Sequence, residues 1–191
     1  MSRNKRAELV ERSLWLFYRN GFHATGMDLV AKETGVSKTS IYKHFRTKEE
    51  LILAALQLRD TNFRSWLFDR METLADTPKA QMLAIFDAIE EWFLEDSFQG
   101  CMFIKASAEY QAEDHAINQQ SMAHKQLLAD HFANLASAAG YVDPETLANR
   151  LMVLKEGAIV LAAMSHSAKP AQDARAIAQV LLETTARKQD A

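Results

Sequence analysis

Apolar side chains recur every three or four positions along most of this chain, which is the spacing of one buried face on an α-helix. The first such stretch runs from Ala7 to Asn20 and places Val10, Leu14 and Phe17 on the buried side. Further helices are predicted at 51–71, 78–95, 101–110, 115–138, 144–166 and 170–188. Because no segment alternates between apolar and polar residues as a strand does, the pattern predicts an all-α protein.

Two short helices around a glycine turn are predicted directly after the first helix. Thr25 is expected to cap the first of the two, and Gly35 is expected to end it in the left-handed backbone conformation. Ser37 is expected to cap the second helix. Ile41 and Phe45 then lie four residues apart on its buried face.

Capping residues and prolines mark the starts of the later helices. Thr47 and Glu50 have the spacing of a capping box at the start of a long helix. Pro78, Pro144 and Pro170 are expected in the first turns of three others, where proline is tolerated. Together with the apolar spacing, these signals predict about nine helices.

The face of the second short helix that lies opposite its buried side is polar and partly basic. It carries Lys38, Thr39, Ser40, Tyr42, Lys43 and His44. These side chains suit a helix that lies in the major groove of DNA. Thr25 and Lys48, at the starts of neighbouring helices, are expected to contact phosphates. The alternative is a plain helical hairpin in an all-α core, and the capping signals and the polar face favour DNA binding.

The charge of the chain is divided unevenly and supports this interpretation. The 191 residues carry a formal net charge of −3, which is unusual for a protein that binds nucleic acid. Residues 1–50 contain ten Lys or Arg and six Asp or Glu and have a charge of +4, so the remainder carries −7. The basic part is the part with the two short helices, which steers that end toward phosphate.

Four short segments in this basic part share the pattern of a known family. They are Gly21-Phe22-His23-Ala24-Thr25, Gly35-Val36-Ser37-Lys38, Ile41-Tyr42-Lys43-His44-Phe45 and Lys48-Glu49-Glu50-Leu51. With the helix before them, they resemble the tetracycline-repressor (TetR) family of bacterial transcription regulators. Thr39 stands where the family often has glycine, and it adds a methyl and a hydroxyl group to the surface that would face DNA.

The resemblance implies a three-helix DNA-binding domain over residues 1–50 and a helical ligand-binding and dimerisation domain over residues 51–191. It implies a ligand-responsive transcription regulator, most often a repressor, which a small molecule releases from a palindromic operator in double-stranded DNA. No cofactor is expected. A helical dimeric module that binds a partner protein is the alternative. No catalytic set of Ser, His and Asp or of Cys and His stands out, so an enzyme is not expected.

One helix near the C-terminus is apolar on more than one face. One stripe can serve its own core, namely Leu147, Leu151, Leu154, Ala158 and Leu161. The leftover stripe and part of the last helix predict a two-fold dimer interface made of Val153, Gly157, Val160, Met164, Ile177, Val180, Leu181 and Thr184. A helix buried wholly within one subunit is the alternative. Family members form a four-helix bundle between subunits here, and a second copy lets two short helices address a palindrome.

The helices between residues 80 and 165 carry polar groups among bulky ones, and in the resembled family this region encloses a small-molecule pocket. The candidates are Trp92, Met102, Phe103, Glu109, Tyr110, His124, Leu128, Met152 and Glu156. Aromatic and methionine side chains with a few polar groups suit such a pocket, and a plain core is the alternative. His124 is either a hydrogen-bonded core histidine or a ligand contact. Glu156 requires a partner because an unpaired buried carboxylate is costly, and His124 is a candidate for it.

The single cysteine, Cys101, excludes an intramolecular disulfide and favours a reducing cytoplasm. It stands at a predicted helix start, so an oxidant or electrophile sensor is an alternative to a small buried apolar residue. Residues 1–6 are not followed by the apolar run of a signal peptide, and residues 151–164 are too few and too charged to span a membrane. The wide spacing of the histidines does not predict a metal site.

Overall fold

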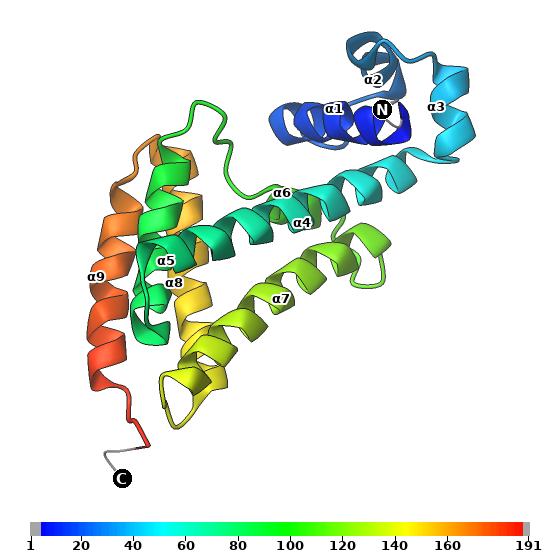
Figure 1. Cartoon of the computed structure of the whole chain (residues 1–191). Coiled ribbons are helices and arrows are strands. Elements are labelled where there is room, and N and C mark those ends of the chain that lie inside the picture. The colour runs from blue at the N-terminus through cyan, green and yellow to red at the C-terminus, as the bar shows by residue number, and fades with distance from the viewer. Residues whose placement is uncertain (1–4, 189–191) are drawn as a thin grey trace. The chain divides into compact units, whose positions relative to one another are not determined.

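The structure is a computed structural model that describes residues 5–188, so residues 1–4, at the start of the segment considered above for a signal peptide, lie outside it (Figure 1). Across the described residues the chain forms nine α-helices, and Tyr141 and Arg187 form an isolated β-bridge. The helices are α1 (Lys5–Asn20), α2 (Met27–Thr34), α3 (Lys38–His44), α4 (Lys48–Leu74), α5 (Pro78–Phe93), α6 (Met102–Glu109), α7 (Ala116–Ala138), α8 (Pro144–Ser165) and α9 (Lys169–Thr184). The all-α prediction is confirmed.

The turn between α2 and α3 forms as predicted. Gly35 ends α2 with a φ of 70°, in the left-handed region that glycine adopts without steric cost. The Ser37 hydroxyl accepts a hydrogen bond from the backbone N–H of Ser40 at 3.2 Å and caps α3. Ile41 and Phe45 are buried, so the side of α3 that faces the core is the predicted one.

Thr25 does not cap α2, and that prediction is wrong. Gly26 occupies the N-cap position, and no side chain accepts a hydrogen bond there. Thr25 is fully buried, and its hydroxyl donates to the backbone carbonyl of Gly21 at 2.6 Å. Because this hydroxyl is used inside the loop between α1 and α2, the Thr25 side chain is not presented to a phosphate.

The long helix α4 contains 27 residues and is about 40 Å long at 1.5 Å per residue. The Thr47 hydroxyl accepts from the backbone N–H of Glu50 at 3.2 Å, which is one half of the predicted capping box. In the other half the Glu50 carboxylate accepts from the N–H of Arg46 rather than from that of Thr47. Two hydrogen bonds therefore fix the start of α4, and the one to Glu50 comes from the residue before the predicted donor.

The last helix ends at Thr184, four residues earlier than predicted. The chain then turns to pair with the loop between α7 and α8. The N–H of Val142 donates to the carbonyl of Ala186 at 3.1 Å, and the N–H of Lys188 donates to the carbonyl of Gly140 at 2.8 Å. These bonds replace the helical ones that residues 186–188 would otherwise form.

The chain divides into two compact units. The first comprises the chain up to Phe63 together with Met102–His124, and the second comprises Arg64–Cys101 together with the chain from Lys125 onward. This division differs from a boundary at residue 50 because α6 and the start of α7 group with the N-terminal helices. The division into a DNA-binding and a ligand-binding domain is a functional one and stays a prediction.

Each unit has its own apolar core. In the first, Leu9, Phe17, Phe22 and Val30 join α1, α2 and the loop between them, and none of these side chains is more than 1% exposed. In the second, α5, α8 and α9 lie side by side (Figure 1). The side of α9 that faces the core is built largely from Ala171, Ala174 and Ala178, whose small side chains let the helices approach closely. No helix within residues 5–188 combines the length and the apolar character needed to cross a membrane.

Candidate DNA-binding surface and buried polar clusters

The outer face of α3 is exposed and polar. Lys38, Thr39, Tyr42 and Lys43 are all exposed, and Tyr42 as a whole residue is 47% accessible. The Lys38 ammonium forms an ion pair with Asp28 at the start of α2, so it holds α2 and α3 together as well as facing outward. This face therefore combines cations, hydroxyl groups and an aromatic ring on a rigid base.

Ser40 and His44 lie on a different side of α3. They line a hollow that is also lined by Lys5 and Arg12 of α1 and by Gly35 of the turn. The predicted DNA-contacting residues of α3 therefore form two groups, one on the outer face of the helix and one beside α1.

Two arginines of α1 belong to this region and were not among the predicted site residues. The Arg12 guanidinium donates to the carbonyl of Thr34 at 3.2 Å, and it pairs with Glu8 at 2.8 Å. The Arg6 guanidinium lies over the Phe45 ring, 4.7 Å from its centre. The excess of basic residues in the first 50 positions was the only sequence signal for them.

Lys48 has a structural partner at the start of α4. Its ammonium donates to the backbone carbonyl of His23 at 3.3 Å. Lys48 therefore already supports the loop between α1 and α2, and its contact with a phosphate stays a prediction.

Glu109, a predicted pocket residue, also binds this loop. Its carboxylate accepts from the backbone N–H of Phe22 at 2.9 Å and of His23 at 2.6 Å, and it pairs with the His23 ring at 2.9 Å. Burial acts to raise the pKa of Glu109, but the hydrogen bonds from His23 and Phe22 outweigh it, so the pKa lies below its ordinary value. The carboxylate is therefore ionised at neutral pH.

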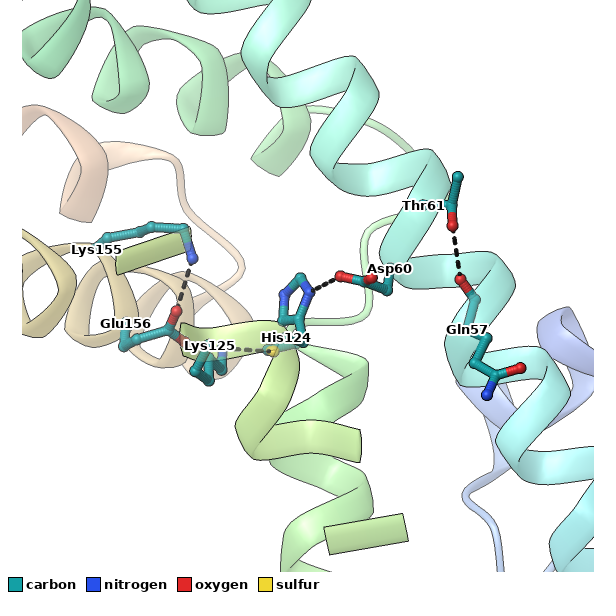
Figure 2. Close-up of polar contacts among 8 residues, drawn as sticks. Gln57, Asp60, Thr61, His124, Lys125, Lys155 and Glu156 are labelled. Carbon is teal, nitrogen blue, oxygen red and sulfur yellow. Dashed lines mark hydrogen bonds and ion pairs between the residues drawn. The ribbon is translucent and has the colours of Figure 1, made fainter. Parts of the chain in front are cut away.

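His124 of α7 pairs with Asp60 of α4 in a buried contact. Figure 2 shows the His124 ring facing the Asp60 carboxylate, and the distance from Nδ1 to Oδ1 is 2.6 Å. The Phe103 ring is stacked on the His124 ring, with ring centres 3.7 Å apart. His124 is thus a hydrogen-bonded core histidine, which was one of its two interpretations, and the hypothesis that it pairs with Glu156 is wrong.

Glu156 instead binds two lysines of the second unit. Its carboxylate accepts from Lys125 at 2.6 Å and from Lys155 at 2.6 Å (Figure 2). Burial acts to raise the pKa of Glu156, but the two ammonium groups outweigh it and lower the pKa to about 2. Burial lowers the pKa of Lys155, whose side chain is 1% exposed, despite the nearby carboxylate. Sequence reasoning missed Lys155, although a lysine within an apolar helix was a visible signal.

Cys101 belongs to the same cluster. It is 9% exposed, and its sulfur accepts a hydrogen bond from the Lys125 ammonium at 3.2 Å. Burial acts to lower the pKa of Lys125, but Cys101 and Glu156 outweigh it, so its pKa is raised. In the part of the chain that the structure describes, no three His, Cys, Asp or Glu residues are grouped so that they could hold a metal ion.

The other pocket candidates are buried within the two units. Met102, Phe103 and Tyr110 lie in the first unit, with Glu109 and His124. Trp92, Leu128 and Met152 lie in the second, with Glu156. Their burial is compatible with a core and with a pocket lining, so the pocket stays a prediction.

The leftover apolar stripe of α8 is exposed. Val153 is 73% accessible and Met164 is 74% accessible, and on α9 Ile177 and Val180 are each more than half exposed. Gly157, Val160 and Thr184 are also exposed, whereas Leu181 is half-buried. This is an apolar surface that spans two helices of one unit.

Leu161 belongs to this exposed surface, and its prediction as a core residue is wrong. It is 57% accessible, although Leu147 and Leu151 of the same predicted stripe are buried. The reason is geometric. A stripe read with a seven-residue repeat drifts around a straight helix by about 20° per repeat, so Leu161, two repeats after Leu147, has turned toward Val160 and Met164.

Within this all-α fold, α2, the turn at Gly35 and α3 form a helix-turn-helix motif whose outer face is polar. Residues 9–55 match the model of a family described as bacterial regulatory proteins, tetR family. Over these residues the chain is similar to the TetR family of bacterial regulatory proteins. The relatives that it matches are named as transcriptional regulators.

Three relatives illustrate the similarity. The HTH-type transcriptional activator FasR of Mycolicibacterium smegmatis is 38% identical over 89 residues, which are 45% of this chain and 41% of that protein. The HTH-type transcriptional regulator YjdC of Escherichia coli is 22% identical over 93% of each chain. The crystal structure of SCO4454, a TetR-family transcriptional regulator from Streptomyces coelicolor, gives a TM-score of 0.88 at 25% identity and covers 97% of this chain and 91% of that one. The match to FasR thus covers less than half of that protein.

Proposed function

We propose that this protein is a homodimeric repressor that binds a palindromic operator through α3 and is released from it by a small molecule. The observation that carries the DNA-binding part is the exposed polar face of α3, held on the buried side chains of Ile41 and Phe45. Lys38 and Lys43 supply charge for phosphates, and Thr39 and Tyr42 supply groups that can reach base edges.

The experiment that tests this function is a binding assay with DNA. Genomic fragments from around the gene are bound by the purified protein, and the salt dependence of the affinity is measured by gel shift. Specific binding that weakens steeply with salt supports the proposal, since contacts to phosphates release counterions. DNA binding at background level, combined with a stable protein partner, supports the alternative of an interaction module.

The dimeric state is supported by the apolar surface on α8 and α9. Monomeric proteins rarely expose several large apolar side chains side by side, and Val153, Val160 and Met164 are three such residues on one helix. The partner that fits is a second copy, because a two-fold axis places the same patch on both sides of the interface. Two copies also present two α3 helices, as a palindromic operator requires.

Replacing Val153 and Val160 together by glutamate is expected to convert the dimer to a monomer, because four like charges then face one another across the two-fold axis. The molar mass in light scattering should fall by half, and operator affinity should fall by at least about tenfold because one α3 contacts only half of the site. The matched control is Val142→Glu, at a position that is 53% exposed but lies outside the stripe. A double variant that remains dimeric would contradict this interface.

A thermal-shift screen against metabolites and antimicrobial compounds tests the effector. A true effector raises the melting temperature and lowers operator affinity, because it must bind the DNA-free conformation more tightly than the DNA-bound one. FasR is named an activator, so a transcription assay with the selected operator is needed to establish the sign of regulation.

A second candidate function, sensing of electrophiles by Cys101, has one observation in its favour. The Lys125 ammonium donates a hydrogen bond to the Cys101 sulfur at 3.2 Å, so the thiol has a polar partner within an otherwise buried site. Treatment with N-ethylmaleimide, whose double bond accepts the thiolate and a proton, is expected to add one adduct by mass and to weaken DNA binding at least fivefold. Cys101→Ser should give neither effect. An alkylated protein with unchanged DNA affinity would exclude the sensor.

A further inference from the structure

The loop between α1 and α2 forms a small binding site for a carboxylate, and Glu109 fills it. Gly21 has a φ of 86°, so the next two backbone N–H groups, of Phe22 and His23, point the same way. Convergent N–H groups after such a residue form a nest that binds anions. Glu109 lies 86 and 87 residues away in the sequence, yet its two oxygens accept from these two groups at 2.6 and 2.9 Å.

Gly21 fits this contact in two ways. Its positive φ is strained for other residues, and a Cβ atom at this position would lie 3.0 Å from Oε1 of Glu109. The lack of a side chain therefore permits both the shape of the loop and the approach of the carboxylate.

Two residues near Glu109, one on α6 and one directly after it, hold the same region. The Tyr110 ring stacks on the His23 ring with centres 4.7 Å apart. One turn earlier, the Lys105 ammonium donates to the carbonyl of Tyr18 at 3.1 Å. Lys48 at the start of α4 binds the carbonyl of His23. The loop that leads from α1 into α2 and α3 is thus fixed from α6 and from α4.

We propose that Glu109 is a positioning residue for DNA binding. It contacts no DNA itself. Its carboxylate sets the direction in which the chain enters α2, and so the orientation of α3. The inference rests on the proposed function, since it requires that α3 binds DNA.

The experiment compares three variants with the wild type on a duplex that the wild-type protein has selected from a random-sequence library. Glu109→Ala removes both acceptors, and Glu109→Gln keeps one acceptor but turns an NH₂ group toward the other N–H. Glu113→Gln, at an exposed site four residues later, is the control for loss of one charge. Amide hydrogen exchange at Phe22 and His23 is measured together with the affinity.

We expect Glu109→Ala to speed exchange at Phe22 and His23 at least tenfold and to weaken binding to the selected duplex about tenfold. Glu109→Gln should lie between it and the wild type, and Glu113→Gln should match the wild type. Faster exchange with unchanged affinity would overturn the proposal, because the contact would then be structural only. If Glu109→Ala does not fold, the Gln variant decides by the same criterion. A wild type that selects no duplex would instead refute the proposed function and not the role of Glu109 alone.

Discussion

Replacing Tyr42 and Lys43 together by alanine is expected to weaken binding to the selected operator by at least about 100-fold. Both side chains are exposed on the outer face of α3 and take no part in the core, so the fold should be retained. Lys43 supplies a charge for phosphate, and a contact to a base edge is typically worth about 1–3 kcal/mol in each half-site. Because the proposed dimer presents this surface twice, the losses from the two half-sites add.

Fluorescence anisotropy with the selected duplex and with an unrelated duplex measures this effect. The unrelated duplex should lose only a few-fold in affinity, because it depends on phosphate contacts alone. Lys79→Ala removes the same charge from the start of α5 and serves as the control. Unchanged specific binding by the double variant would show that α3 is not the recognition helix.

Glu156→Gln is expected to lower the free energy of unfolding by about 3 kcal/mol at pH 7. The pKa of Glu156 falls from 4.5 to about 2 in the folded protein, and each pKa unit corresponds to about 1.36 kcal/mol. A depressed pKa stabilises the fold above the unfolded value, so this contribution is fully present above pH 4.5 and is lost as the pH falls toward 2. The difference between wild type and variant should therefore shrink below pH 4.5.

Urea unfolding at pH 7 and at pH 3.5 measures both parts of this prediction. Glu145→Gln, at an exposed position near the start of the same helix, should change the free energy of unfolding by less than about 0.5 kcal/mol. A Glu156→Gln variant as stable as the wild type at pH 7 would mean that the two lysines do not depend on this carboxylate.

The helices and the turn were predictable because their signals are local. Gly35 and Ser37 act through their own backbone and through neighbours within four residues, so the sequence pattern contained all that was needed. Thr25 does not cap α2 because its hydroxyl donates to the carbonyl of Gly21 instead. The sequence pattern alone does not distinguish between these two hydrogen bonds. The prediction that Leu161 is buried was wrong because the spacing of apolar residues does not show how far a stripe rotates around the helix axis over about four turns.

The polar partners in the candidate sites could not be predicted for a different reason. Glu109 and Phe22 are 87 residues apart, and His124 and Asp60 are 64 apart. A buried histidine or glutamate is expected to have a hydrogen-bond partner, but the sequence does not say which residue it is. The partner depends on which helices pack together. Some members of the clusters could therefore be predicted from the sequence, but the pairs that they form could not.

The two faces of α9 have separate chemical roles, and this separation has a consequence for evolution. Ala171, Ala174 and Ala178 are buried and determine how closely α9 approaches its neighbouring helices, whereas Ile177 and Val180 are exposed and take no part in that packing. In the proposed dimer, substitutions on the outer face can therefore change which copy pairs with which without a loss of folding stability. After a gene duplication, two descendants of this protein could become separate homodimers through α9 alone, and so avoid mixed pairs that would join mismatched half-sites.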